Sequence, residues 1–395
     1  MRILLINHFP LQGSGSGVYV ANIAKSLKKK GHKTCIISPE NTSKFSNIKD
    51  IKLHPVFFKF NETIENQQEF NFPCFDPHPR SSLLFCDMTD EQIEKYEEAF
   101  RKAIKQEIEE FKPDIIHAQH IWIISSIASE FNIPLVITSH GSDIMGYNWW
   151  KNFHKYAKNA TSKASKIIAI SNHNADVISE IFHKDRKKII TISNGYDEKK
   201  FYKEIINKKS VLRKYGINKN YKKIVCFSGR LTENKGIDIL LKAAKIYENE
   251  HILTLIAGDG EEYKYLKELE EKLELKNIKF LGNRNADELR EIYNISNVCA
   301  VPSRQEAFGL VALEAIACGT PVVASNQGGI PDFVTKEVGK LIETENIEQL
   351  AEAINEILKK QRKYNSYKLA KYAKQSYRQD LLIDKLIEAY KSVEA

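Results

Sequence analysis

The sequence predicts an α/β protein made of two doubly wound, Rossmann-like domains. Short apolar runs rich in β-branched residues recur along the chain, and amphipathic helical segments separate them. Continuous runs of this kind are typical of strands that are buried on both faces of a parallel sheet. The chain has 395 residues, of which 42% are hydrophobic, so each of two domains can bury a core of its own. The same alternation occurs in both halves, which predicts two domains of similar design.

The first domain is expected to span residues 1–200. Helices are predicted at 18–30, where Gly31 ends the pattern, and at 91–111. Residues 41–90 contain several prolines and follow no regular period, so they are expected to form an irregular insertion near the ligand face. The strands are predicted at 3–6, 34–38, 114–117, 134–138, 166–170 and 188–192.

The second domain is expected to span residues 201–375, after a boundary in the Lys- and Asn-rich segment 199–221. Residues 345–395 are predicted to be helical. A doubly wound sheet binds its ligand outside the carboxyl ends of its strands. Two such domains are therefore expected to face each other across a cleft, lined by polar residues that follow the strands. The strands are predicted at 223–227, 253–256, 278–280, 298–301 and 321–324.

Composition and charge exclude several classes of protein. No run of about 18 apolar residues occurs, so no membrane span is expected. The first residues read as a strand and not as a signal peptide, so a cytoplasmic protein is expected. The net charge of +8 is compatible with an anionic ligand or with a peripheral contact at the inner face of an anionic membrane, and it requires neither. No basic stripe is interleaved with aromatic residues over a long stretch, which argues against nucleic acid as a partner.

The most informative segment lies between residues 298 and 321. Glu306 and Glu314 stand eight residues apart, and Phe308-Gly309 is predicted to open a helix between them. Backbone N–H groups point outward at the start of a helix, where a phosphate binds readily. One carboxylate could then accept hydrogen bonds from the hydroxyls of a sugar while the other accepts them from a ribose. An alternative is a surface helix that carries two solvated glutamates.

A pair of cations follows the first strand of the second domain. Arg230 and Lys235 lie in the glycine-bounded loop 228–236, immediately after strand 223–227. Arginine offers a planar fork and lysine a point charge, a combination that suits a diphosphate. Two solvated surface cations are the alternative interpretation.

Two weaker signals follow strands of the first domain. Gly15 and Gly17 belong to Gln12-Gly-Ser-Gly-Ser-Gly17, which is predicted to be a loop whose backbone approaches a phosphate or a sugar. The glycine spacing differs from the Gly-x-Gly-x-x-Gly pattern of dinucleotide-binding domains, so a flexible connection is an equal alternative. His140 follows strand 134–138 and precedes a glycine, which favours a position facing the cleft. The alternative is a histidine bonded to nearby backbone.

No metal site is expected. His117 and His120 form a His-x-x-His pattern after a strand, but no third ligand is apparent. The chain contains no Asp-x-Asp sequence, the pattern with which many sugar transferases hold Mg²⁺ or Mn²⁺ on a diphosphate. A cofactor is not expected either.

These motifs together resemble the retaining GT-B glycosyltransferases of family 4, over essentially the whole chain. The most specific likeness is the segment 303–324, which looks like the Glu-x7-Glu motif of that family and its continuation. The resemblance implies that the second domain holds a nucleotide-sugar donor and the first domain an acceptor. It also implies that the last helix, at about 376–395, packs back on the first domain. Other family landmarks occur in the expected order at 140–141, 194–201, 229–236 and 258–260.

The resemblance implies a role for each candidate residue. Glu306 would bind hydroxyls of the donor sugar and Glu314 the ribose. Arg230 and Lys235 would stabilise the departing nucleoside diphosphate, together with the backbone amides of Phe308, Gly309 and Leu310. His140 would lie beside the sugar, Gly15 and Gly17 would close on the donor from the first domain, and Arg284 would border the base.

The implied reaction transfers a hexose or an N-acetylhexosamine with retention of anomeric configuration and without a metal. No carboxylate is clearly placed as a nucleophile, so the family's same-face reaction through an oxocarbenium-like transition state fits the residues present. The frequency of donors in the family favours a UDP-sugar. The acceptor stays open among a lipid-linked glycan, a cell-surface polymer, a protein and a small metabolite.

Two other enzyme classes are alternatives. A sugar-nucleotide epimerase with the same two-domain design would need an acid/base pair facing the sugar, and none can be picked out. A nicotinamide-dependent oxidoreductase would use the first glycine loop, with Glu40 on a ribose. The irregular glycine spacing and the second phosphate-like site both argue against that alternative.

Overall fold

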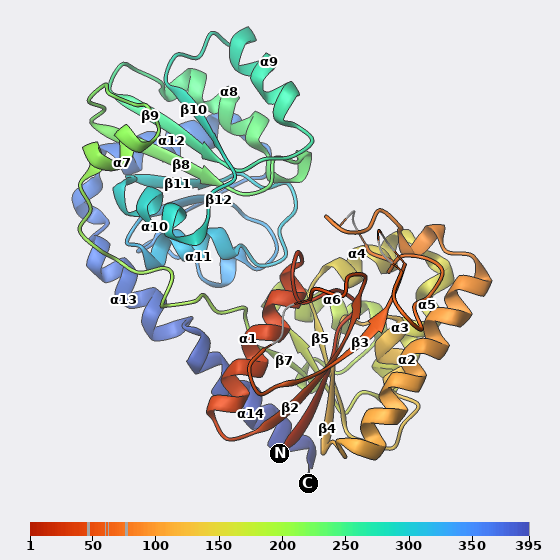
Figure 1. Ribbon diagram of the computed structural model, residues 1–395. Coiled ribbons are helices and arrows are strands. Elements are labelled where there is room, and N and C mark those ends of the chain that lie inside the picture. The colour runs from red at the N-terminus through yellow and green to blue at the C-terminus, as the bar shows by residue number, and fades with distance from the viewer. Residues whose placement is uncertain (46–47, 60, 62, 76–77, 395) are drawn as a thin grey trace. The chain divides into compact units, whose positions relative to one another are not determined.

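The computed structural model describes residues 1–45, 48–59, 61, 63–75 and 78–394. Its contacts divide the chain into two compact units, Met1–Ile192 with Leu382–Ala395, and Ser193–Leu381. Each unit consists of one parallel sheet with helices on its faces (Figure 1). The two sheets confirm the α/β class with two doubly wound domains.

The first unit has a seven-stranded sheet of order β3-β2-β1-β4-β5-β6-β7, in which all neighbouring strands are parallel. Its strands are β1 (Arg2–Ile6), β2 (Lys33–Glu40), β3 (Lys52–Phe57), β4 (Ile115–Gln119), β5 (Leu135–Ser139), β6 (Lys166–Ala169) and β7 (Ile189–Thr191). Its helices are α1 (Gly15–Lys29), α2 (Asp90–Glu110), α3 (Ile123–Ala128), α4 (Ser142–Trp149), α5 (His154–Lys163), α6 (Asn172–Phe182) and α14 (Gln379–Glu394), with short 3₁₀ turns η1 (Phe85–Asp87), η2 (Lys151–Phe153) and η3 (Arg186–Lys188).

The second unit has a six-stranded parallel sheet of order β10-β9-β8-β11-β12-β13. Its strands are β8 (Lys223–Ser228), β9 (Ile252–Ala257), β10 (Ile278–Gly282), β11 (Val298–Val301), β12 (Val322–Ser325) and β13 (Gly339–Ile342). Its helices are α7 (Lys208–Lys214), α8 (Ile237–Tyr247), α9 (Tyr263–Lys272), α10 (Ala286–Ile295), α11 (Leu310–Ala317), α12 (Ile347–Lys359) and α13 (Ser366–Ser376), with 3₁₀ turns η4 (Glu233–Lys235), η5 (Ile330–Asp332) and η6 (Gln361–Lys363).

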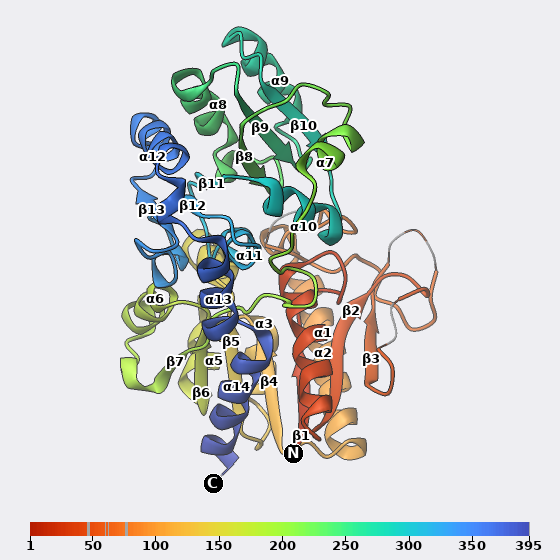
Figure 2. The same cartoon turned by 90° about the vertical axis from the view of Figure 1, so that its left-hand side faces the viewer.

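Both faces of the first sheet are buried, because successive side chains of a strand point to opposite faces. Leu4 and Ile6 of β1 belong to the apolar core under α2, α3 and α5. Ile3 and Leu5 belong to the core on the other face, which α1 and α14 cover. Figures 1 and 2 show α1 and α14 on that face. Burial on both faces explains why the strands appear in the sequence as unbroken apolar runs.

The last helix is anchored on the first unit by polar as well as apolar contacts. Tyr390 of α14 is fully buried in the core that contains Ile3 and Leu5. Its hydroxyl lies 2.6 Å from Nδ1 of His117 on β4. Nε2 of His117 lies 2.7 Å from Oγ1 of Thr138 on β5. Both ring nitrogens of this buried histidine are therefore used inside the fold.

Three elements differ from the sequence-based expectation. The segment 41–90 contains a strand, β3, although parts of the segment lie outside the described residues. The sequence did not predict this strand because it contains Pro55, and proline is rare inside strands. The structure tolerates the proline because β3 lies at the edge of the sheet. Helix α1 begins at Gly15, so the predicted glycine loop is partly helix. Strand β13 was not predicted, because Gly339-Lys-Leu-Ile342 is too short to give a period.

Within the described ranges, no helix combines the length and the apolar character needed to cross a bilayer.

Candidate functional site

Three loops of the second unit follow the carboxyl ends of neighbouring strands. They are residues 229–236 after β8, 258–262 after β9 and 302–309 after β11. The three strands are adjacent and parallel, so the loops lie at one edge of the sheet. The glycines of these loops allow the backbones to touch. A Cβ atom on Gly258 would lie 1.8 Å from the carbonyl oxygen of Gly229, and one on Gly260 would lie 2.4 Å from that of Leu231.

The centre of the site is an ion pair between two of the predicted residues. Nζ of Lys235 lies 2.7 Å from Oε2 of Glu306, and both side chains are largely buried. Gly236 makes the approach possible, because it adopts φ +66° and a Cβ atom there would lie 2.1 Å from the carbonyl oxygen of Pro302. The hydroxyl of Ser303 lies 3.4 Å from the same carboxylate oxygen.

A second ion pair fixes the loop that carries Glu306. Arg304 binds both carboxylate oxygens of Asp238 on α8, at 2.8 and 3.0 Å, and its Nε donates to Glu345 at 2.6 Å. Its backbone N–H also donates to the carbonyl of Asn234 at 2.8 Å. A bidentate arginine–carboxylate contact is among the stronger polar contacts in proteins. Arg304 is therefore a positioning residue, and sequence reasoning missed it because Asp238 stands 66 residues away.

Helix α11 begins beside the Glu306 loop. Gly309 forms its N-cap with φ +93°, and no side chain among the described residues caps it. A Cβ atom on Gly309 would lie 2.7 Å from Cγ1 of Ile330, so the position requires glycine. Phe308 is buried against Phe333, with ring centroids 5.2 Å apart, whereas Leu310 is partly exposed. The turn thus directs backbone N–H groups outward from a firmly packed base.

Glu314 lies in the middle of α11 and is mostly buried. Burial raises the pKa of its carboxyl group to about 8, and the positive charge of Lys200 partly opposes the rise. Sequence reasoning placed this residue correctly on the helix but gave no indication of its protonation. A largely protonated carboxyl group can both donate and accept a hydrogen bond, which suits a diol such as that of a ribose.

The raised pKa of Glu314 predicts that the protein becomes less stable as the pH rises. Below about pH 4.5 the group is protonated in both the folded and the unfolded chain, and above that pH only the unfolded chain loses the proton readily. Stability contributed by Glu314 is therefore lost as the pH rises towards 8. From pH 6 to pH 9, the free energy of unfolding of the wild-type protein is expected to fall by about 2–3 kcal/mol more than that of Glu314→Gln. Chemical unfolding across this range measures the difference, with exposed Glu352→Gln on α12 as the control. Parallel curves for all three proteins would contradict the assignment.

The two other predicted residues of this unit have partners of their own. Arg230 is more than half exposed, and its guanidinium lies 3.4 Å from Glu261, so it is free to turn towards a ligand. Arg284 is held more firmly. It donates to the carbonyl of Leu281 and to Glu288, and its guanidinium stacks over the ring of Tyr215 at 5.5 Å.

The predicted glycines of the first unit have different surroundings. Gly15 is exposed, with open space around it. Gly17 is buried, and a Cβ atom there would lie 2.0 Å from the carbonyl oxygen of Pro10. Its N–H donates to the hydroxyl of Ser14, the N-cap of α1, at 3.0 Å. The expectation of a loop at Gly15 and Gly17 was therefore wrong, because the Ser14 cap starts the helix before them.

His140 lies at the end of β5 in a network of hydrogen bonds. Its Nε2 lies 2.9 Å from Oε1 of Gln119 at the end of β4. Its backbone N–H and that of Gly141 donate to the buried carboxylate of Asp143, which fixes the turn. Burial, reinforced by nearby His120, lowers the pKa of His140 to about 3. The imidazole is therefore neutral at physiological pH and can act as a hydrogen-bonding group but not as a cation.

Within the described residues, no group of three His, Cys, Asp or Glu side chains could hold a metal ion. Glu40, the residue that an oxidoreductase would use on a ribose, is buried and paired with Arg80 at 2.9 Å.

Comparison with known proteins identifies the family. A model described as "Glycosyltransferase Family 4" matches residues 13–200, and one described as "Glycosyl transferases group 1" matches residues 207–376. The D-inositol 3-phosphate glycosyltransferase of Corynebacterium urealyticum is 31% identical over 307 residues, which cover 71% of this chain and 72% of that protein. This chain belongs to glycosyltransferase family 4.

Two further relatives of the glycosyltransferase differ in the share of each chain that the match covers. The N-acetyl-alpha-D-glucosaminyl L-malate synthase of Bacillus anthracis is 24% identical over 98% of this chain and 95% of its own length. An uncharacterized glycosyltransferase of Methanocaldococcus jannaschii is 31% identical, and the match spans only 66% of that protein.

Solved structures share the fold of the glycosyltransferase along almost the whole chain. Sucrose-phosphate synthase from Thermosynechococcus elongatus superimposes with a TM-score of 0.79 at 20% identity, covering 99% of this chain and 98% of that one. HepE of Anabaena, solved in complex with UDP, superimposes with a TM-score of 0.76 at 20% identity, covering 99% of this chain and 100% of that one. The fold is therefore GT-B.

Proposed function

We propose that this glycosyltransferase moves a hexose or an N-acetylhexosamine from a UDP-sugar to an acceptor hydroxyl, with retention of anomeric configuration and without a metal. One observation carries the proposal: the Lys235–Glu306 pair at 2.7 Å, beside the uncapped start of α11. These are the groups that a nucleotide sugar needs, a cation and backbone N–H groups for its diphosphate and a carboxylate for its sugar.

The diphosphate is bound by charge and by backbone. Lys235 and Arg230 supply two positive charges, and the N–H groups of Phe308, Gly309 and Leu310 supply directed donors at the start of α11. When the glycosidic bond breaks, negative charge develops on the leaving phosphate. Preorganised cations and dipoles stabilise such charge without reorganisation, which is commonly the largest contribution to catalysis.

The two glutamates take different parts of the donor. Glu306 is held by Lys235 in the free protein, and in the complex it accepts hydrogen bonds from sugar hydroxyls while Lys235 turns to the phosphate. Glu314 binds the ribose, and Arg284 borders the base. Structures of a distant relative in complex with UDP and with UDP-glucose support the choice of donor, as does the N-acetylglucosaminyl product named for the Bacillus anthracis relative.

The transfer takes place on one face of the sugar. The leaving phosphate helps to take the proton of the acceptor hydroxyl, so the protein needs no carboxylate nucleophile. His140 acts as a neutral hydrogen-bonding group, because its pKa of about 3 keeps it uncharged. The acceptor is assigned to the first unit, and a lipid-linked glycan, a surface polymer and a small metabolite are the candidate classes.

Donor binding in the absence of metal tests the proposal. Ligand-observed NMR with a panel of nucleotide sugars in EDTA is expected to show binding of a UDP-sugar to wild-type protein and strongly reduced binding to Glu314→Ala. The variant loses the partner of the ribose but keeps the packed base of α11. Equal binding by both proteins would remove Glu314 from the site. Binding that requires added Mg²⁺ or Mn²⁺ would overturn the metal-free reaction, and conversion of the donor to an epimer without acceptor would replace transfer by epimerisation.

A further inference from the structure

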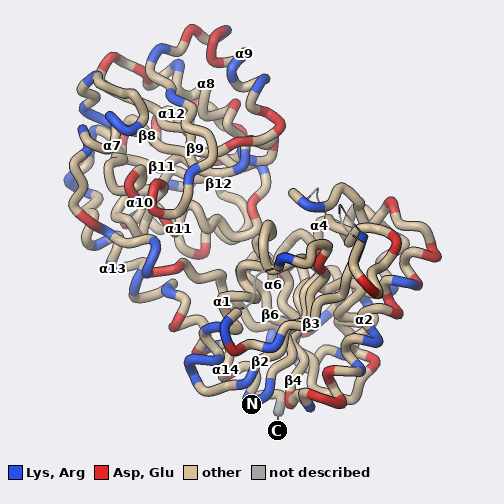
Figure 3. The backbone as a smooth tube through the Cα atoms, viewed as in Figure 1, with Lys and Arg blue, Asp and Glu red and all other residues tan. Residues whose placement is uncertain are grey.

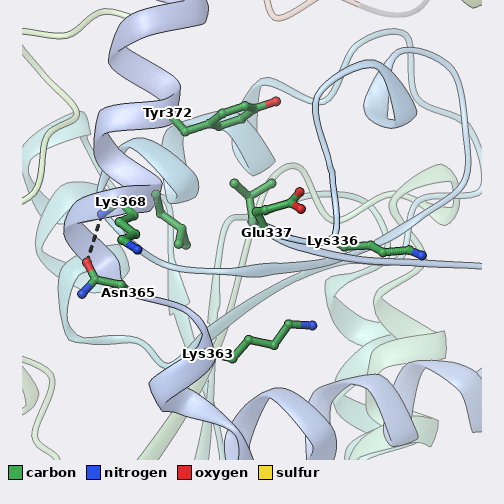
Figure 4. Close-up of a pocket in the computed structure, with 8 residues that line it drawn as sticks. Lys336, Glu337, Lys363, Asn365, Lys368 and Tyr372 are labelled. Atoms are coloured by element: carbon green, nitrogen blue, oxygen red, sulfur yellow. Dashed lines mark hydrogen bonds between the residues drawn. The ribbon is translucent and has the colours of Figure 1, made fainter.

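The second unit contains a pocket that uses none of the residues assigned to the donor. It has a volume of about 480 Å³ and lies between the segment that precedes β13 and the start of α13 (Figure 4). Val338 and Leu369 form its buried base. Tyr372 forms a wall, and its hydroxyl donates to the carbonyl of Phe333 at 2.8 Å.

Three lysines surround this pocket. Lys363 ends η6, Lys368 lies in the first turn of α13, and Lys336 comes from the opposite side (Figure 4). Each is exposed, and none has a carboxylate within 4.0 Å among the residues that the structure describes. Glu337 is the one acidic residue among those that line the pocket, so the lining carries a net charge of +2, from three lysines and one glutamate.

The wider surroundings are also positive. Residues 357–379 contain eight Lys and Arg residues and no Asp or Glu. The net charge of the whole chain is +8, so the remainder of the chain is neutral on balance. Figure 3 shows where lysine and arginine fall along this segment. Charge concentrated in one short segment, next to a pocket, indicates an anionic ligand more strongly than the same charge spread over a surface.

We propose that this pocket binds a phosphate group, carried either by a free anion or by a lipid headgroup. The ammonium groups of Lys336, Lys363 and Lys368 do not converge in Figure 4, and a bound phosphate would draw these exposed side chains inward by its charge. The side chain of Asn365 already accepts the N–H groups of Tyr367 and Lys368, so the lysines and not the helix end provide the binding charge. Lys371, Lys374 and the 61%-exposed Tyr367 continue the surface along α13, where a membrane could lie.

The test compares two triple variants with the same change in net charge. Lys336→Ala/Lys363→Ala/Lys368→Ala removes the lysines of the pocket. Lys264→Ala/Lys272→Ala/Lys276→Ala removes three exposed lysines of the same unit, on and after α9. Each protein is titrated with inorganic phosphate by calorimetry, and with vesicles of phosphatidylcholine alone or mixed in equal parts with phosphatidylglycerol by flotation.

The pocket variant is expected to bind phosphate or the anionic vesicles at least about tenfold more weakly than the wild type and the control variant do. Each lysine near an anionic surface contributes roughly 1 kcal/mol. If the pocket variant loses only its binding of inorganic phosphate, the ligand is a free anion. If it loses only its binding of the anionic vesicles, the ligand is a lipid headgroup. Equal affinities for all three proteins, or no binding of either probe by wild type, would overturn the proposal. Single Lys363→Glu provides the same comparison if the triple variant does not fold.

Discussion

Replacement of Lys235 by alanine is expected to lower kcat/KM for sugar transfer about 10²–10³-fold, the loss typical of removing one preorganised group that stabilises transition-state charge. The lysine is the partner of the largely buried Glu306 at 2.7 Å, and its loss leaves that carboxylate without a cation in the free protein. In the complex, the leaving diphosphate loses its nearest point charge. Steady-state kinetics with a donor identified by NMR measures the effect, and a cooperative thermal transition shows whether the fold is kept.

Lys242→Ala is the matched control for this variant. Lys242 belongs to the same unit, has a similar exposure and pairs with Asp238 at 3.0 Å, but Arg304 holds Asp238 without it. Transfer is expected to stay within about twofold of wild type, since Lys242 is not among the donor-binding residues and Arg304 keeps Asp238 paired. Comparable activities for Lys235→Ala and Lys242→Ala would remove Lys235 from the machinery.

Gly328→Ala is expected to destabilise the second unit by roughly 3 kcal/mol and to abolish donor binding. A Cβ atom at this position would lie 1.6 Å from the carbonyl oxygen of Glu306, so one of the two backbones must move. Forced displacement of a packed segment commonly costs about 1–3 kcal/mol, and contact with backbone places this variant at the upper end. The displaced segment carries the carboxylate that meets Lys235.

Gly216→Ala separates this effect from the cost of the backbone angle. Gly216 also has a positive φ, +72°, but no atom lies within 4 Å of a Cβ built there. Its replacement is expected to cost about 1 kcal/mol, the penalty of the left-handed conformation alone, and to leave donor binding intact. Melting curves and donor titrations on both variants provide the comparison. Equal losses of stability together with normal donor binding would show that the Gly328 contact relaxes without consequence.

The sequence predicts those features that depend on neighbours along the chain. Lys235 lies at the end of a loop that a buried strand and two glycines define, so its place at the sheet edge could be expected. Glu306 and Glu314 flank a helix start that Gly309 marks. The structure brings Lys235 and Glu306 together because β8 and β11 are adjacent and parallel, a relation that follows from the doubly wound order.

Features that depend on distant residues could not be predicted. The pairing of Arg304 with Asp238 joins a loop and a helix that are far apart in the sequence, and neither residue stands in a distinctive pattern. The pKa of Glu314 is set by burial, which the side chains of the surrounding elements create. Strand β3 could not be predicted because it contains Pro55. A proline is tolerated only in an edge strand, and the edge position is a property of the finished sheet.

The bond between His117 and Tyr390 joins residues that are 273 positions apart, and it has a consequence for biosynthesis. During translation, the core around Ile3 and Leu5 lacks the part that α14 covers until late, because the α14 residues that complete it follow the whole second unit in the chain. The second unit can complete its core earlier, since its chain ends at Leu381. Domains commonly fold in the order of their synthesis. Here the unit that is made first is the one that matures last, and a premature stop before residue 382 would release a chain with an exposed apolar face.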